Sequence, residues 1–248
     1  MGRCTKVEFQ KIPATPGYSQ GKVETMIHWA GVTKSKNKEE FIQFNYDQTR
    51  CFIDTLIELD MTPSQFVFIS TLSVFGPIKE DNYQPIEESD KPQPNTAYGL
   101  SKLKTEEYIQ SLPNFPYLLF RPTGVYGPRE KDYFMMAQSI KNHFDFSVGF
   151  KKQEITFVYV KDLVEAVFLG IDTKRTRRAY FVTDGGVYSS KTFSDYIQQE
   201  LGISFLVRIK CPLFLLKVIS LLAESFAKWM GKSSTLNSDK YKIMKQRN

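Results

Sequence analysis

The sequence has 248 residues, enough for one α/β domain with a modest appendage and too few for two full-sized domains. A hydrophobic fraction of 42% and a charged fraction of 24% are ordinary for a globular protein and exclude disorder along the whole chain. The net charge of +6 is a small excess, and no basic face interleaved with aromatic residues points to a nucleic-acid partner. No cysteine pattern typical of zinc sites occurs, so no metal is expected.

The hydropathy pattern bears on location. No apolar run reaches the roughly 18 residues that a membrane span needs. Residues 1–10 lack the apolar stretch of a secretory signal. We therefore expect a cytoplasmic protein.

Short, continuously apolar segments in the first two thirds of the chain predict strands. They cover residues 25–30, 66–70, 117–121, 157–160 and 180–182. Helical spacing of apolar residues predicts helices over about 38–59 and 96–111, between these strands. Alternating helices and fully apolar strands are typical of a parallel, doubly wound α/β sheet with helices on both faces. The last third predicts helices over 191–201 and 213–230.

A tyrosine and a lysine, Tyr98 and Lys102, are spaced to lie on one helix face, one turn apart. A nearby ammonium favours the phenolate, so the spacing predicts a Tyr98 pKa lowered from about 10 toward neutrality. Such a phenol can exchange a proton with a carbonyl or hydroxyl group while hydride moves. The pattern alone is weak, since Tyr18/Lys22 and Tyr241/Lys245 repeat it and an exposed helical pair explains any single instance.

The surroundings distinguish Tyr98 from the other two tyrosines. The predicted strand 66–70 leads into Thr71, and hydroxyls at the carboxyl ends of parallel strands lie where α/β folds bind ligands. The predicted strand 117–121 leads into the loop 122–129, which reaches the same edge of the sheet.

The order of motifs resembles the extended short-chain dehydrogenases/reductases of the NAD-dependent epimerase/dehydratase family, from about residue 25 onward. The motifs are His28-Trp-Ala-Gly31, Asn45-Tyr-Asp-Gln-Thr49, Ser70-Thr-Leu-Ser-Val-Phe-Gly76, Tyr98-xxx-Lys102, Arg121-Pro-Thr-Gly-Val-Tyr-Gly-Pro128, Phe157–Val164 and Tyr180–Gly185. The resemblance implies a Rossmann-like fold that binds NAD or NADP. It also implies a dinucleotide-binding domain over 1–131, to which 156–184 return, and a small, mainly helical substrate cap over 132–155 and 185–248.

The resemblance also implies roles for individual residues. Tyr98 would be the general acid/base, and Thr71 would hydrogen-bond the reacting oxygen. Lys102 would lower the pKa of Tyr98 and hold the ribose of the cofactor. Asn45 corresponds to an asparagine near the active site, with the alternative that it only satisfies local backbone. The implied cofactor-binding residues are Ala30, Gly31, Ser70, Tyr98, Lys102, Pro122 and Val125. We interpret His28 and Trp29 as strand residues packed at the sheet.

One part of the family pattern is missing. The family begins with a strand, a glycine-rich turn and a helix that hold the pyrophosphate. Gly17 and Gly21 follow no strand and do not match that motif. The sequence therefore predicts a chain without the first βαβ unit, a fragment whose cofactor binding on its own is weak or absent.

Departures from the family pattern bear on the substrate. Leu72 and Ser73 stand where dehydratases of the family carry an Asp-Glu pair, and Ile155-Thr156 stand where sugar-nucleotide enzymes carry Arg-Asp. These differences favour oxidoreduction of a hydroxyl or keto group on an apolar, sterol-like small molecule. The apolar segment 212–223 is interpreted as a core helix of the cap. The less favoured alternatives are an apolar wall for a lipid-like ligand and a helix lying on a membrane.

Two further functions stay open. The first is nucleotide-sugar epimerisation, in which hydride is removed and returned at one site without net redox. The second is a non-catalytic remnant that acts only through subunit pairing. The resemblance implies a homodimer of the full-length protein through the helices at about 38–59 and 96–111.

Overall fold

The computed structural model describes residues 23–35, 37–79, 83–150, 152–229, 241–242 and 245. Gly17, Gly21 and the Tyr18/Lys22 pair lie outside these residues. Within them, no helix combines the length and the apolar character needed to cross a bilayer.

The centre of the fold is a four-stranded, wholly parallel sheet in the order β1-β2-β3-β8. Its strands are β1 (Thr25–His28), β2 (Gln65–Ile69), β3 (Tyr117–Pro122) and β8 (Arg178–Val182). All five residues of β2 are buried because both faces of the sheet are covered. Four of the predicted strands are therefore confirmed, with ends shifted by a few residues.

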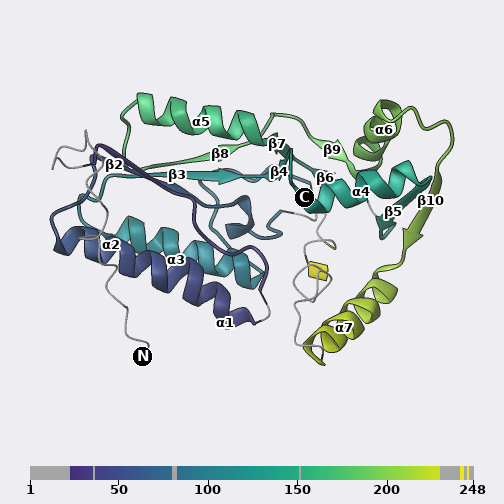
Figure 1. Ribbon diagram of the computed structural model, residues 1–248, viewed down its shortest axis with the longest axis horizontal. Coiled ribbons are helices and arrows are strands. Elements are labelled where there is room, and N and C mark those ends of the chain that lie inside the picture. The colour runs from purple at the N-terminus through teal and green to yellow at the C-terminus, as the bar shows by residue number, and fades with distance from the viewer. Residues whose placement is uncertain are drawn as a thin grey trace.

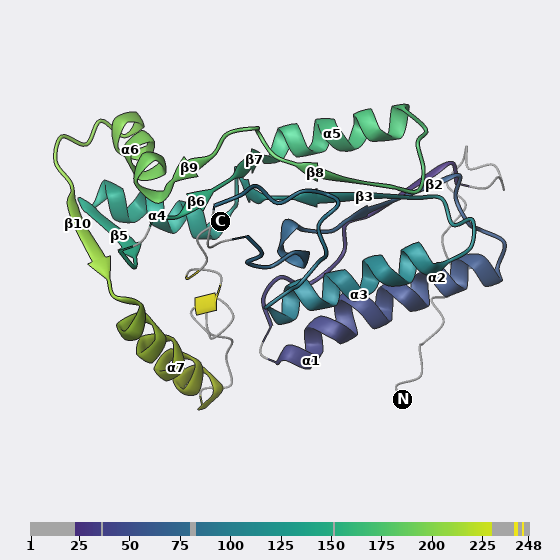
Figure 2. The same ribbon diagram turned by 180° about the vertical axis from the view of Figure 1, so that it is seen from behind.

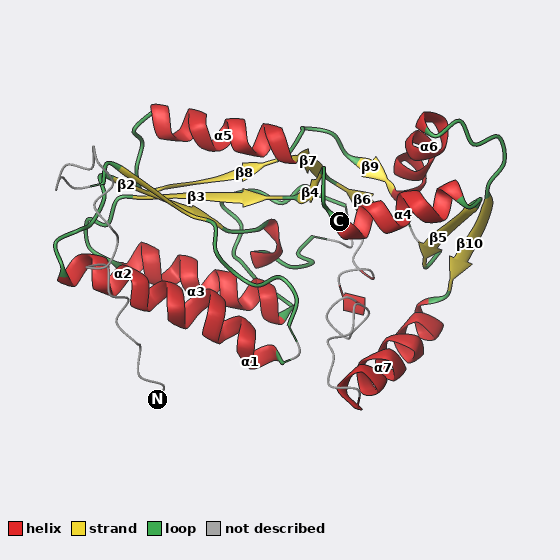
Figure 3. Cartoon of the chain, viewed as in Figure 1, coloured by secondary structure: helices red, strands yellow, loops and turns green. Residues whose placement is uncertain are grey.

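Helices cover both faces of this sheet (Figures 1 and 3). One face carries α1 (Lys38–Phe41), the π-helical turn η2 (Ile42–Asp47), α2 (Gln48–Glu58) and α3 (Ala97–Ser111); the other carries α5 (Val160–Asp172). Val67 and Ile69 of β2 pack in the cluster that contains Leu163 and Val167 of α5. Their neighbours Phe66 and Phe68 pack with residues of α2 and α3, as the alternation of a strand requires. The predicted Rossmann-like α/β arrangement is confirmed.

The predicted strand 157–160 forms β7 (Phe157–Tyr159), which pairs with β4 (Gly124–Tyr126) outside the four-stranded sheet. Helix α5 begins directly after β7 and was not predicted. The apolar run at its start reads equally well as a strand or a buried helix, so sequence pattern alone could not separate them.

A second group of elements lies at one end of the molecule, beyond β4 and β7 (Figures 1 and 2). It contains α4 (Lys131–Lys141), the parallel pair β5 (Phe144–Val148) and β10 (Val207–Cys211), the antiparallel pair β6 (Glu154–Ile155) and β9 (Tyr188–Ser189), α6 (Ser190–Glu200) and α7 (Leu213–Trp229). The helices predicted over 191–201 and 213–230 are confirmed. The division into a binding domain and a cap stays a prediction.

Helix α7 differs from the core helix expected over 212–223. Leu216 and Ser220 are buried, but Phe214 and Leu222 are mostly exposed. The interpretation as a core helix is wrong, because the helix packs through a single narrow stripe.

Candidate functional site

Thr71 lies just beyond the carboxyl end of β2, where the chain leaves the sheet. It begins a short 3₁₀ turn, η3 (Leu72–Val74), as its N-cap. Its Oγ1 accepts a hydrogen bond from the Ser73 N–H at 3.2 Å and donates to Ser73 Oγ at 3.2 Å. These contacts fix the Thr71 hydroxyl at the edge of the sheet.

Tyr98 is the second residue of α3, and the start of this helix is tightly positioned. The N-cap Thr96 accepts a hydrogen bond from the Gly99 N–H at 3.0 Å. A Cβ on Gly99 would collide with the backbone oxygen of Ser73, so only glycine lets α3 approach η3 this closely. The close approach places the phenol of Tyr98 near the Thr71 hydroxyl, which opposes the rise in the pKa of Tyr98.

Lys102 lies one helical turn after Tyr98 and is 4% exposed. Its Nζ donates to the Ile69 carbonyl oxygen at 2.9 Å and sits 4.6 Å from the centre of the Phe68 ring. The predicted residues Thr71, Tyr98 and Lys102 therefore surround the carboxyl end of β2.

The electrostatics of these groups differ from the sequence prediction. Burial raises the pKa of Tyr98 to about 12, and the hydrogen bond with Thr71 only opposes this rise. Burial lowers the pKa of Lys102 to about 8, against the attraction of Glu106. The predicted lowering of the Tyr98 pKa by Lys102 is wrong for this structure, because burial is the main influence on this pKa and the Lys102 ammonium hydrogen-bonds to the Ile69 carbonyl oxygen. Near neutral pH the phenol keeps its proton and Lys102 is mostly charged.

Asn45 lies in the π-helical turn η2 and is fully buried. Its Oδ1 accepts from the Val32 N–H at 2.7 Å, and its Nδ2 donates to Val32 O at 3.0 Å and to Ser101 Oγ at 2.9 Å. A Cβ on Gly31 would lie 2.8 Å from Asn45 Oδ1 and 3.4 Å from Lys102 Nζ. Asn45 thus fastens the loop after β1 beside Lys102.

The predicted cofactor-binding residues are only partly brought together. Gly31 and Ser70 lie with Lys102 at the ends of β1 and β2, and the exposed Ala30 precedes Gly31. Pro122 ends β3, where it pairs with β8. Val125 packs against the hydrophobic cluster beside α5 instead.

His28 and Trp29 have different environments. The His28 ring stacks near Phe52, Phe66 and Phe68, with Nε2 3.0 Å from Thr49 Oγ1, as expected for a packed strand residue. Burial lowers its pKa to about 4, helped by the charge of Lys102. The same expectation for Trp29 is wrong, because Trp29 lies beyond the end of β1 and is 46% exposed.

Two charged residues near the site were not singled out from the sequence. Arg121 of β3 and Glu106 of α3 are both buried and form a paired hydrogen bond, with Nη2 2.6 Å and Nε 3.1 Å from Glu106 Oε2. The feature of the sequence that could have indicated Glu106 is its position, one helical turn after Lys102.

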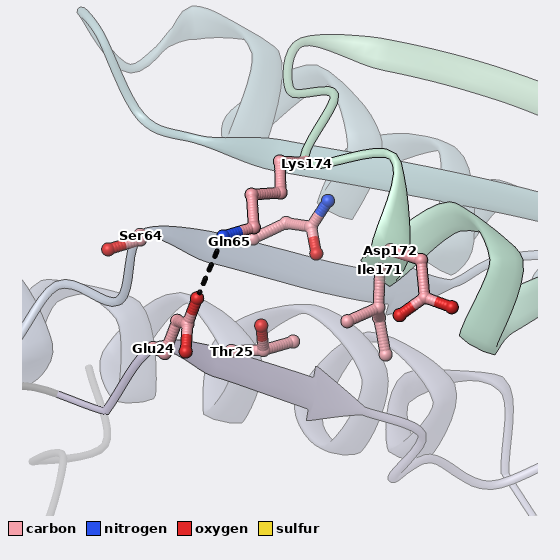
Figure 4. Close-up of a pocket in the computed structure, with 7 residues that line it drawn as sticks. All are labelled: Glu24, Thr25, Ser64, Gln65, Ile171, Asp172 and Lys174. Atoms are coloured by element: carbon pink, nitrogen blue, oxygen red, sulfur yellow. Dashed lines mark ion pairs between the residues drawn. The ribbon is translucent and has the colours of Figure 1, made fainter.

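A pocket of about 280 Å³ lies at the opposite ends of the strands from Thr71 (Figure 4). It is lined by Glu24, Thr25, Ser64, Gln65, Ile171, Asp172 and Lys174. The exposed ion pair between Lys174 and Glu24, at 3.6 Å, spans it in Figure 4. Ligands of parallel α/β sheets bind at the carboxyl ends of the strands, so this pocket is not the expected active site.

The comparisons with known proteins identify the family of the chain. The model of the "NAD dependent epimerase/dehydratase family" matches residues 16–182, well over half of the chain. The chain belongs to this family. The matched range includes β1, β2, α3 and β3, the elements next to which Thr71, Tyr98 and Lys102 lie.

Individual relatives in the family are distant. A "Putative UDP-glucose 4-epimerase" of Methanocaldococcus jannaschii is 29% identical over 195 residues, 73% of this chain and 62% of that protein. The UDP-glucose 4-epimerase of Vibrio cholerae is 26% identical over 193 residues, 72% of this chain and 54% of that protein. The chain thus matches about half to three fifths of the length of these relatives.

A solved structure supports the fold assignment. RMD from Pseudomonas aeruginosa, in complex with NADPH, superposes with a TM-score of 0.67 at 20% identity over 76% of this chain and 68% of that chain. At this identity the likeness establishes a shared fold.

Proposed function

We propose that the chain carries the catalytic set of an NAD(P)-dependent enzyme that moves hydride at a hydroxyl-bearing carbon of a nucleotide sugar. The observation that carries the proposal is that Thr71, Tyr98 and Lys102 lie together at the carboxyl end of β2. The names of the UDP-glucose 4-epimerase relatives support the substrate class.

In this proposal Thr71 and Tyr98 hold the reacting oxygen between them. The Thr71 hydroxyl donates its one proton to Ser73 Oγ in this structure, so it must turn that proton toward the reacting oxygen to hydrogen-bond a carbonyl. Hydride loss from the alcohol needs Tyr98 as the phenolate, which takes the hydroxyl proton, and the resulting phenol returns that proton when the carbonyl is reduced. Because burial raises the pKa of Tyr98 to about 12, the oxidation half of the cycle draws on the minor phenolate form. Lys102 stays charged nearby and stabilises negative charge that develops on the phenol.

The residues at the strand ends fit a nicotinamide dinucleotide, which when bound supplies the hydride acceptor and donor. Among the described residues, the buried Ser70 hydroxyl has no hydrogen-bond partner. Lys102 Nζ has three N–H donors, and among the described residues the Ile69 carbonyl oxygen accepts one of them. Gly31 lets backbone lie close to this ammonium. We infer that Ser70 and Lys102 hold a ribose there, with Gly31 allowing its approach.

Epimerisation fits the site better than dehydration does. Dehydration needs a further acid/base pair, but Leu72 and Ser73 follow Thr71, and Ser73 serves to orient the threonine. Epimerisation needs one proton-transfer residue, which Tyr98 supplies. The sterol-like substrate expected from the sequence gains no support from the names of the two epimerase relatives.

A product assay tests the proposal. The chain is incubated with UDP-glucose or UDP-galactose and millimolar NAD⁺, and the anomeric protons are followed by NMR together with nicotinamide absorbance. The proposal predicts interconversion of the two sugars without accumulation of reduced cofactor. Net reduction of NAD⁺ would favour simple oxidoreduction instead.

A second measurement separates catalysis from subunit pairing alone. NADH and NADPH are titrated calorimetrically into the chain, and its mass is measured by light scattering. A dimer that neither binds cofactor nor turns over sugar would overturn the proposal in favour of a non-catalytic remnant.

A further inference from the structure

Three buried charged side chains follow one another from the proposed catalytic tyrosine, along α3 and across to β3. Lys102 and Glu106 lie one turn apart on α3, and Arg121 reaches Glu106 from β3. Lys102 is 4%, Glu106 1% and Arg121 6% exposed. Charges this deeply buried are rare unless they are paired.

Glu106 is held in one orientation. Arg121 Nε lies 3.1 Å from both carboxylate oxygens, and Nη2 lies 2.6 Å from Oε2. The guanidinium itself stacks 5.1 Å from the centre of the Phe75 ring. The carboxylate therefore cannot turn away toward solvent, and its charge stays one turn from Lys102.

Lys102 needs a fixed counter-charge because its own contacts are mostly neutral. Its ammonium meets the Ile69 carbonyl oxygen and the Phe68 ring. The titratable and charged groups around it are His28 on β1, Tyr98 and Glu106 on α3, and Arg121 behind Glu106. His28 and Tyr98 are neutral near pH 7, so Glu106 is the anion among these groups.

We propose that Glu106, held in place by Arg121, is the positioning residue that supplies the counter-charge of Lys102 and keeps this lysine protonated for catalysis. The inference rests on the proposed function only for its catalytic consequence. Its electrostatic part concerns Lys102 itself, whose pKa is lowered by burial and raised by Glu106.

A purely structural ion pair that only joins α3 to β3 makes a different prediction. Removing either partner of such a pair would disturb Lys102 in the same way, through loosened packing. The proposed role predicts opposite effects. Glu106→Gln removes an attractive charge, whereas Arg121→Gln removes a repulsive charge and keeps an amide that can donate a hydrogen bond to the carboxylate.

The experiment follows the titration of Lys102 by NMR of ¹³Cε-labelled lysine in the full chain. Glu106→Gln is expected to lower the midpoint by about one pH unit, and Arg121→Gln is expected to raise it. Glu107→Gln, which removes a carboxylate from the exposed side of the same helix, is the matched control and should leave the Lys102 midpoint unchanged. An unchanged midpoint in Glu106→Gln, or shifts in the same direction in both variants, overturns the inference.

The double variant Glu106→Gln/Arg121→Gln keeps the test valid if a single variant fails to fold. Its two amides can hydrogen-bond to each other, so neither buried group is left as a lone charge. The Lys102 midpoint is expected to fall, because the lost attraction of Glu106 outweighs the lost repulsion of Arg121. It should fall by less than in Glu106→Gln, because the repulsion is lost as well. A midpoint at or above that of the wild type would contradict the inference.

Turnover measured against pH separates this inference from the proposed function. In Glu106→Gln the alkaline limb of the rate profile should move to lower pH by the same amount as the NMR midpoint. If the midpoint moves and the rate profile does not, Glu106 holds its electrostatic role and the catalytic role of Lys102 fails. If neither moves, the inference about Glu106 fails.

Discussion

Replacing Lys102 with methionine should make the protein more stable at neutral pH. Burial lowers the pKa of this lysine from its usual 10.5 to about 8. At ~1.4 kcal/mol for each pH unit, keeping the charge inside the fold at pH 7 destabilises the folded state by about 3 kcal/mol. Methionine keeps the apolar stem and loses the hydrogen bond to Ile69, worth about 1 kcal/mol. The expected net gain for Lys102→Met is therefore about 2 kcal/mol.

The gain should depend on pH in a defined direction. The folded-state pKa of Lys102 lies below that of the unfolded chain, so between pH 8 and 10.5 the unfolded chain binds more protons. Wild-type stability contributed by this group therefore rises with pH across that window. The advantage of Lys102→Met should shrink by about 2 kcal/mol between pH 7 and pH 10.

Urea denaturation of both proteins at the two pH values measures this difference. Lys104→Met, on the exposed side of the same helix, is the matched control and should change stability by less than about 0.5 kcal/mol. A variant that is less stable than the wild type at pH 7, or whose advantage is the same at both pH values, would refute the reasoning. The variant should also lose cofactor affinity, since the proposed function gives the ribose contact to Lys102.

Three further predictions concern neighbouring residues. Asn45→Ala removes the hydrogen bonds to both backbone groups of Val32 and should lower the free energy of unfolding in urea by about 1–3 kcal/mol. A change under about 0.5 kcal/mol would contradict the role of Asn45 in holding the loop after β1. Gly99→Ala drives a Cβ against Ser73 and should displace Tyr98, lowering turnover by about tenfold or more at similar cofactor affinity; unchanged turnover would show that the helix can shift freely. Burial lowers the His28 pKa from 6.5 to about 4, so the wild-type protein loses stability as pH falls through that window. Denaturation at pH 7 and just above pH 4 should show that His28→Leu loses less free energy of unfolding than the wild type does. Equal losses in the two proteins would contradict the lowered pKa.

The four strands of the parallel sheet, and the nearness of Thr71 to Tyr98, were predictable because both depend on local pattern and topology. The fully apolar segment at β2 indicates burial on both faces, and the carboxyl ends of parallel strands share one edge. Those two facts suffice to place Thr71 near the tyrosine at the start of the next helix. Gly99 could have strengthened this prediction, since it follows Tyr98 and permits the close approach of α3.

What the sequence could not supply depends on depth and on long-range pairing. The high pKa of Tyr98 follows from how deeply the phenol is buried, and Tyr-xxx-Lys spacing carries no information about depth. The partnership of Glu106 with Arg121 depends on how α3 packs on β3. The π-helical turn at Asn45 interrupts a stretch whose apolar spacing predicts an ordinary helix.

Tyr98→Phe tests the central claim most directly, with turnover of UDP-sugar and calorimetric cofactor affinity as the two readouts. Tyr241→Phe, which alters the other described Tyr-xxx-Lys pair, is the control. We expect Tyr98→Phe to lower turnover by about 100-fold or more with nearly unchanged cofactor affinity, and Tyr241→Phe to leave turnover as in the wild type. If Tyr98→Phe keeps most of the activity, Tyr98 is not the proton-transfer residue.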